Sequence, residues 1–355
     1  MTPYMQSRQD YETWLRQRIG AGIVETDLTT KRNLMKDSAF SFLRGSYWRW
    51  AELAPDTVPE LLSAPAVLAV GDVHIENFGT WRDADGRLVW GVNDFDEAAV
   101  MPYALDLMRL VVSAVLAADA RKSSFSPIAT PILAGYKAGI AAPSPIVLER
   151  DWSWLREEVV VSEQRRLKFW KKIAERKAEP APAEFRAALA AAMPESDLAF
   201  DTARRVAGTG SLGRPRWIGV ADWRGGPLVR EAKALVTSAW ELARGRPDAP
   251  IRCADIAAGG NRAPDPWYRV ESAIVVRRLS PNNRKIEADR ELDLLLDPRM
   301  LDAMGRELAA LHLGTGDAGA AIKADLAERK RGWLETAAQA MMTATWADWK
   351  AARDE

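Results

Sequence analysis

A chain of 355 residues is long enough for two domains or one large enzyme, at roughly 150 residues per domain. Apolar residues make up 48% and charged residues 28% of it, which is typical of a globular protein and excludes a disordered one. Lys plus Arg and Asp plus Glu both number 49. Because no net positive field attracts nucleic acid or anionic lipid, neither is an expected partner, and any anion site must be local. The expected partner is a small molecule, because only nine residues separate Asp96 from Asp106 and leave no room for a long protein-binding segment.

The rarest residue types restrict the chemistry further. A single cysteine, Cys253, excludes an internal disulfide and fits a reducing compartment. Two histidines, His74 and His312, are too few for a typical zinc or non-haem iron site. A metal would therefore have oxygen ligands, which favours magnesium, with manganese or calcium as alternatives. Residues 1–15 lack the order of a signal peptide and no apolar run has membrane-spanning length, so the expected location is the cytoplasm.

Helix-like and strand-like stretches alternate over the first third of the chain. Residues 1–65 contain helix-like stretches separated by turns and form an α-rich N-terminal segment. Asp85 followed by Gly86 is a strong hairpin signal between two short apolar stretches. Residues 103–120 have the apolar content of a mostly buried helix. The strands expected here are residues 66–70, 78–81 and 87–92.

The rest of the chain changes from helix to strand and back to helix. Residues 151–205 are charged, rich in alanine and interrupted by Pro180 and Pro182, which indicates surface helices joined by a linker. A boundary is expected near Glu195, and residues 292–350 have the pattern of amphipathic helices. Strand-like stretches lie between these regions at Val206 and at residues 217–220, 228–229 and 268–279.

Two polar segments, residues 71–77 and 93–97, directly follow predicted strands. Because a hairpin returns the chain beside its own start, Asp94 should lie near Asn77 and Asp72. Phosphoryl transfer requires one carboxylate that accepts the nucleophile's proton, and an amide with a second carboxylate that hold magnesium on the phosphate oxygens. We assign Asp72 to the first role and Asn77 and Asp94 to the second. The alternative is an ordinary turn, in which Asp and Asn hydrogen-bond their own backbone.

Two nearby residues have structural as well as catalytic interpretations. His74 follows Asp72 in a Gly-Asp-x-His sequence that also begins metallophosphoesterase motifs, but such a site needs several more histidines than this chain has. His74 is therefore either catalytic or, as we favour, a hydrogen-bonding brace of the loop. Asp106 lies inside an apolar helix, where an unpaired carboxylate would be costly. We expect Asp106 to anchor the catalytic loop through backbone amides.

Residues 208–213 contain a glycine pattern, G-x-G-x-x-G, whose flanks decide its interpretation. A dinucleotide-binding fold requires a helix directly after the loop, but here a strand pattern follows. Strand, glycine loop, strand, turn and a second strand with a cation is the protein-kinase order, in which the loop covers phosphates. A glycine-rich hairpin without a ligand is the alternative. The expected phosphate-binding residues in this loop are Gly208, Gly210, Ser211 and Gly213.

The strand after the glycine loop offers two cations, Arg230 and Lys233. Only alternate residues of a strand share a face, so both should not point toward the phosphates unless the strand has ended. We favour Arg230 and keep Lys233 as the second candidate. Arg277 and Arg278, further along the chain, either line the same cleft or form a solvated edge.

Six segments in this order resemble the successive motifs of the bacterial domain of unknown function 2252 family. This family is similar to aminoglycoside phosphotransferases and other kinase-like enzymes, whose catalytic loop also reads Gly-Asp-x-His with Asn five residues after Asp. The glycine loop follows the catalytic loop here, so the resemblance implies a circularly permuted kinase-like fold. The family usually has lysine where this chain has Arg230, and arginine has a different donor geometry. The matching segments are residues 40–45, 71–79, 93–97, 208–213, 230–232 and 308–312.

The patterns together predict an α+β fold with α-rich N- and C-terminal segments, and the resemblance implies that it is two-lobed, kinase-like and circularly permuted. The expected activity is ATP- and magnesium-dependent phosphoryl transfer to a small-molecule hydroxyl. A non-catalytic nucleotide-binding pseudokinase and a nucleotidyl transferase with the same site are the alternatives. The expected regions are an α-rich segment (1–65), a catalytic region (66–195), a β-rich nucleotide-binding region (196–290) and C-terminal helices (291–355).

Overall fold

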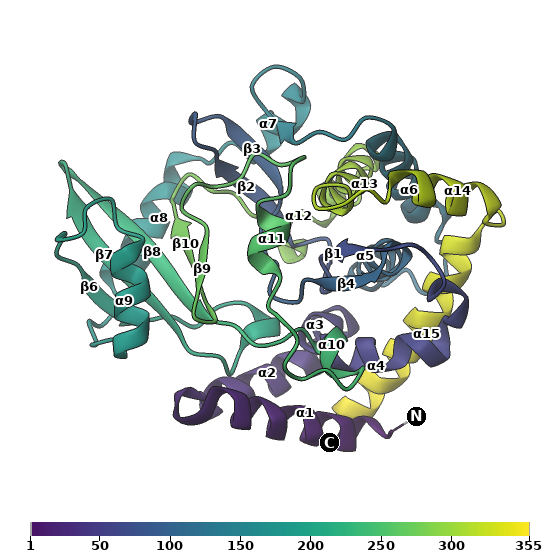
Figure 1. Ribbon diagram of the computed structural model, residues 1–355, viewed down its shortest axis with the longest axis horizontal. Coiled ribbons are helices and arrows are strands. Elements are labelled where there is room, and N and C mark those ends of the chain that lie inside the picture. The colour runs from purple at the N-terminus through teal and green to yellow at the C-terminus, as the bar shows by residue number, and fades with distance from the viewer. Residues whose placement is uncertain (1, 355) are drawn as a thin grey trace.

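The computed structural model describes residues 2–354 and combines helices with three antiparallel sheets (Figure 1). This arrangement confirms the expected α+β class. Most of the helices form one body, and the largest sheet lies at its side with its own covering helices (Figure 1). No helix within residues 2–354 combines the length and the apolarity needed to cross a bilayer.

The N-terminal segment is helical, as expected, but it is divided more often than its sequence pattern indicates. Residues 32–50 have a helix-like pattern in the sequence, but the structure divides them at Ser38, whose hydroxyl accepts a hydrogen bond from the Ser41 N–H at 3.0 Å and so begins a new helix. The Ser46 hydroxyl donates to Phe42 O at 2.6 Å where that helix ends. The helices are α1 (Tyr4–Ile19), α2 (Glu25–Asp37), α3 (Ala39–Gly45) and α4 (Tyr47–Thr57), with 3-10 turns at Gly20–Gly22 and Pro59–Leu61.

Two small sheets position the first polar motifs. The predicted hairpin is confirmed, since β2 pairs with β3 and Phe78 lies opposite Val92. The 66–70 strand is also confirmed, but its partner β4 was not predicted, because a four-residue strand lies directly before a helix. The strands are β1 (Ala66–Ala69), β2 (Phe78–Arg82), β3 (Leu88–Val92), β4 (Ala99–Pro102) and β5 (Ile146–Val147), in the orders β1-β4 and β2-β3-β5.

The centre of the helical body is α5 (Tyr103–Ala117), which is buried over most of its length, as its sequence predicts. The C-terminal α15 (Trp333–Arg353) packs against α5 and also against the N-terminal helices, so both ends of the chain share one core. Figure 1 shows the two termini near one another. The other helices of this body are α6 (Ser126–Ala141), α10 (Ala239–Leu242), α11 (Cys253–Ala257), α12 (Ala288–Leu295), α13 (Pro298–His312) and α14 (Gly319–Glu328).

The third sheet has five strands in the order β6-β7-β8-β10-β9, and a helix packs against each face. Phe185 and Leu189 of α9 cover the face that carries Trp217, and Phe169 of α8 packs near Ile218 on the opposite face. Val206, which the sequence pattern predicts to lie in a strand, follows the end of β6 and is 60% exposed. The elements are α7 (Ser153–Val159), α8 (Glu163–Ala174), α9 (Ala183–Ala191), β6 (Asp201–Arg204), β7 (Arg216–Trp223), β8 (Gly226–Ala234), β9 (Arg269–Glu271) and β10 (Ile274–Leu279).

Candidate functional site

A cavity of about 1250 Å³ is lined by residues of both polar segments, 71–77 and 93–97, and of the glycine loop at residues 208–213, which we call the glycine turn. The glycine turn is far from the two polar segments in the sequence, and the structure brings all three to one cavity. Seven of the ten predicted site residues line the cavity: Asp72, His74, Asn77, Asp94, Gly208, Gly210 and Ser211. Three do not line it, and these are Gly213, Arg230 and Lys233.

The loop that carries Asp72 begins at a position that only glycine fits. Gly71 has a φ of +80°, and a Cβ there would lie 2.3 Å from Glu97 O. The buried carboxylate of Asp106 accepts hydrogen bonds from Val70 N–H at 2.8 Å and Gly71 N–H at 3.0 Å. The prediction that Asp106 anchors this loop through backbone amides is therefore confirmed.

His312, to which sequence reasoning gave no role, belongs to the same anchor. Its Nε2 lies 3.1 Å from Asp106 Oδ2, and its Nδ1 lies 2.8 Å from the hydroxyl oxygen of Tyr136. All three side chains are buried. A hydrogen-bonded chain thus runs from α13 through Asp106 to the backbone before Asp72, and it fixes the start of the loop.

The Asp72 carboxylate is held by a fully buried cation. Arg109 of α5 donates to Asp72 Oδ1 and also to Leu43 O at 2.9 Å. Its guanidinium carbon lies 4.9 Å from the centre of the Tyr47 ring. Burial raises the pKa of Asp72 to about 7, although Arg109 lowers it, and Glu97 raises it further. A carboxyl group with such a pKa can accept and release a proton near neutral pH.

The contacts of His74 support its role as a brace. Its Nδ1 accepts a hydrogen bond from Glu76 N–H at 3.2 Å, two residues along the loop. Its ring meets the edge of Phe40 with the ring centres 6.1 Å apart. Burial, together with the nearby Arg44, keeps the pKa of His74 well below its usual range, so the ring is neutral.

Asn77 and Asp94 lie beside one another at the ends of the β2–β3 hairpin. The Asn93 N–H donates to Asn77 O at 3.1 Å, so the expected proximity of the two polar segments is confirmed. The Oδ1 atom of Asn77 is buried without a hydrogen-bond partner. The Asp94 side chain is 41% exposed. Its partial desolvation raises its pKa, but Lys233, with Arg277 and Arg216, outweighs this effect and holds the pKa well below the usual range. This pair offers one amide oxygen and one ionised carboxylate to a cation.

The glycine turn packs directly against Asp72. Gly208 has a φ of +77° and precedes a 3-10 turn at Thr209–Ser211. A Cβ on Gly210 would lie 3.3 Å from Asp72 Oδ2 and 3.1 Å from Arg44 O, so glycine allows this close approach. The Lys31 ammonium group donates to Gly210 O at 2.7 Å and so helps to fix the turn. Gly213 has a different role, because a Cβ there would lie 2.4 Å from Leu28.

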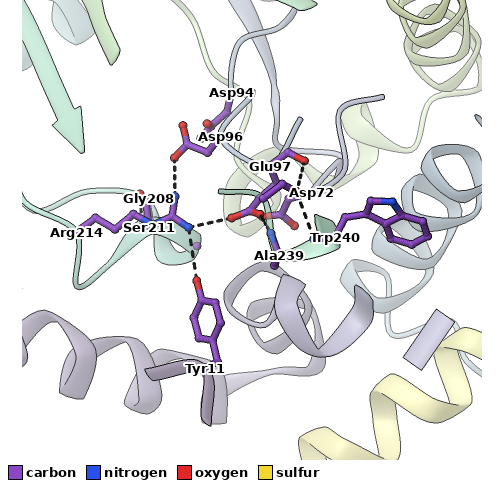
Figure 2. A network of polar contacts seen from close by, with 12 residues as sticks. Tyr11, Asp72, Asp94, Asp96, Glu97, Gly208, Ser211, Arg214, Ala239 and Trp240 are labelled. Carbon is purple, nitrogen blue, oxygen red and sulfur yellow. Dashed lines mark hydrogen bonds and ion pairs between the residues drawn. The ribbon is translucent and has the colours of Figure 1, made fainter. Parts of the chain in front are cut away.

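Arg214, which follows the glycine turn, connects it to the acidic segment at residues 94–97 (Figure 2). Its buried guanidinium donates to Glu97 Oε1 at 2.9 Å and lies 3.5 Å from Asp96 Oδ2. The second Glu97 carboxylate oxygen accepts from Ala239 N–H at 2.7 Å. Sequence reasoning assigned no role to Glu97 or Arg214, since their pairing depends on a contact across 117 residues.

The structure corrects the choice between Arg230 and Lys233. Arg230 lies on the face of β8 that α9 covers, where its Nε donates to Ala192 O at 3.0 Å and its guanidinium carbon lies 4.3 Å from the centre of the Trp267 ring. Lys233 projects from the opposite face, and its Nζ lies 2.5 Å from Asp96 Oδ1 and 3.4 Å from Asp94 Oδ1. The alternation of a continuous strand places the second candidate, not the first, beside the acidic segment.

The comparisons with known proteins identify one family. The model described as "Uncharacterized protein conserved in bacteria (DUF2252)" matches residues 23–197 and 172–355. No curated protein and no solved structure matched the chain.

Proposed function

The chain belongs to the DUF2252 family of bacterial proteins, and from the geometry of its cleft we propose that it is an ATP- and magnesium-dependent phosphotransferase acting on a small-molecule hydroxyl. One observation carries this proposal: the glycine turn lies against Asp72 in a cavity that Asp94 and Asn77 also line. In such enzymes catalysis consists of positioning and charge stabilisation around the phosphates, which this cleft can supply.

Asp72 is the proposed general base. It would accept the proton of the acceptor hydroxyl as that oxygen attacks the terminal phosphorus. Its pKa of about 7 suits this role, because a base near neutral pH is both ionised and able to take up a proton. Arg109 orients the carboxylate through its hydrogen bond to Oδ1, and the Asp106 anchor fixes the backbone that carries Asp72.

Asn77 and Asp94 are the proposed magnesium ligands. The unpartnered Asn77 Oδ1 and the accessible Asp94 carboxylate fit a hard cation that prefers oxygen. Within residues 2–354 no group of three or more His, Cys, Asp or Glu side chains forms a complete cation site. Two protein oxygens suit magnesium that keeps waters and shares phosphate oxygens. When bound, this ion would neutralise charge on the transferred phosphoryl group.

Lys233, rather than Arg230, is the proposed cation of the site, and because it does not line the cavity it acts through the carboxylates of Asp94 and Asp96. Its contacts with Asp94 and Asp96 place its charge beside the proposed metal site. This assignment supports a permuted kinase-like arrangement, with the five-stranded sheet as the nucleotide-binding lobe. Arg230, whose replacement of the family's lysine motivated the pseudokinase alternative, lies on the face of β8 opposite to Lys233, so it is not the cation beside Asp94 and Asp96.

The acceptor is proposed to be a small molecule because the chain has no room for a protein-binding activation segment. Only nine residues separate Asp96 from Asp106. They contain the strand β4, in which only Val100 is exposed, and the buried first turn of α5. A metabolite or antibiotic hydroxyl can enter such a cleft without a long loop to position it.

A metabolite mixture incubated with ATP and magnesium tests this proposal by mass spectrometry. Phosphoryl transfer would add a phosphate mass to one acceptor, and nucleotidyl transfer would add a nucleoside monophosphate mass. Magnesium-dependent nucleotide binding without any product would favour the pseudokinase.

The roles of the two aspartates are tested in the same assay. We expect Asp72→Asn to lower the rate at least about 100-fold with nucleotide binding retained, and Asp94→Asn to abolish the magnesium dependence of binding. Asp222→Asn, at an exposed position of β7, is the matched control and should match the unaltered protein. Full activity of Asp72→Asn would contradict the assignment.

A further inference from the structure

Three arginines surround one buried carboxylate between the glycine turn and the segment that carries Asp94. Glu231 of β8 is 1% exposed, and its Oε1 accepts from Arg216 at 3.0 Å and from Arg277 at 2.7 Å. Arg205, which follows β6, pairs with the other oxygen, Oε2. Glu231 and Lys233 project from the same face of β8, and Arg230 projects from the opposite face. The arginines that pair with Glu231 therefore lie on the same side of the sheet as Lys233.

This arginine cluster, Arg205, Arg216 and Arg277, contacts both the glycine turn and the segment that carries Asp94. Arg216 Nη2 donates to Ser211 Oγ in the glycine turn at 2.6 Å. Arg277 Nη1 donates to Asn93 O, next to Asp94, at 3.4 Å. All three arginines line the cavity, whereas Glu231 does not. Donors from the cluster thus face the space between the turn and the metal-binding pair.

The charge of the cluster is not balanced by its own carboxylate. Three guanidinium groups and one carboxylate carry a net charge of +2. Burial, together with repulsion from Arg277, lowers the pKa of Arg216 to about 10, and the same causes lower the pKa of Arg205. Asp96 and Asp94 offset part of this charge at Arg216, but the arginines still repel one another, and an anion in the cavity would stabilise them.

We infer that the arginine cluster is the binding site for the triphosphate chain of the nucleotide, an inference that rests on the proposed function. Guanidinium groups pair with phosphate oxygens through two parallel hydrogen bonds, which a single lysine cannot do. Glu231 orients the three side chains and is not itself a ligand. The glycine turn covers the same phosphates, because Ser211 connects it to Arg216.

Calorimetric titration with ATP, inorganic tripolyphosphate and adenosine tests the inference. Arg277→Gln and Arg205→Gln remove partly exposed members of the cluster, so both are expected to fold, with unfolding temperatures measured for each. We expect the dissociation constants for ATP and tripolyphosphate to rise about tenfold or more. The affinity for adenosine should not change. Arg269→Gln, at an exposed position of β9, is the matched control and should behave like the unaltered protein.

The outcomes separate this inference from the proposed function. If the unaltered protein binds ATP and both variants bind tripolyphosphate equally well, the inference fails and the nucleotide function stands. If tripolyphosphate binds through these arginines but ATP binds no more tightly than the inorganic ion and adenosine does not bind, the cluster is supported and the nucleotide function fails. Absence of any binding to the unaltered protein would overturn both.

Discussion

Asp72 combines two environments that oppose each other. Burial disfavours its ionised form, while Arg109 stabilises that form, and the balance brings its pKa to about 7. The other carboxylate proposed for the site, Asp94, differs because Lys233 and nearby arginines keep its pKa far below neutral pH. One carboxylate can therefore exchange protons while the other stays charged, which is the division that a base and a metal ligand require.

We expect kcat/KM to rise with pH through about 7, because Asp72 must lose its proton before it can act as a base. Arg109→Gln removes a cation that lowers this pKa, so the midpoint should move to higher pH, whereas Arg109→Lys keeps the charge and should move it less. A pH–rate profile measures both. An unchanged midpoint in Arg109→Gln would contradict the proposed coupling of Arg109 to Asp72.

Among the elements of the site, the glycine turn is the one whose backbone approaches Asp72 closely. In Gly210→Ala the added methyl group would press on Arg44 O and Asp72 Oδ2, which displaces the turn. We expect an activity loss of about tenfold or more, because small displacements of positioning groups are costly, with little change in stability. Gly226→Ala, where the methyl group meets open space, is the control for a steady-state assay. Equal activities of the two variants would contradict a role for the turn.

At the scale of elements, α5 supplies Asp106, which anchors the loop that carries Asp72. Asp106→Ala leaves two buried backbone N–H groups without an acceptor, and each such group costs about 1–3 kcal/mol. We expect the free energy of unfolding, measured with urea, to fall by about 3 kcal/mol or more. Asp56→Ala, at an exposed position of α4, should change it by less than about 0.5 kcal/mol. A loss no larger than that of the control would show that the anchor is not important for stability.

At the scale of the whole molecule, Arg214 joins the segment entering the five-stranded sheet to the helical body. Arg214→Met would leave the buried Glu97 without its cation, and breaking a buried pair costs about 3–5 kcal/mol. Arg224→Met breaks an exposed pair with Glu195 and should cost at most about 1 kcal/mol. Denaturant unfolding of both variants measures the difference. Similar losses would indicate that the Arg214 contact does not hold the two parts together.

Local patterns in the sequence predicted the elements near the site well. The β1 strand, the β2–β3 hairpin, the buried α5 and the anchoring role of Asp106 all depend on neighbours in the chain or on the cost of burying a charge. Short elements such as β4, and the division of the N-terminal helices at Ser38, were missed. Their stability comes from pairing or capping contacts that leave only a weak pattern.

By itself the sequence determined which residue types could do chemistry here: carboxylates, one amide, a glycine turn and cations, with almost no histidine or cysteine. Only the tertiary structure decided that the glycine turn contacts Asp72, that Lys233 and not Arg230 faces Asp94, and that Glu231 pairs with three arginines. The physical reason is that side-chain identity is local, whereas charge pairing depends on which face of a strand a helix covers and on contacts between segments more than 100 residues apart.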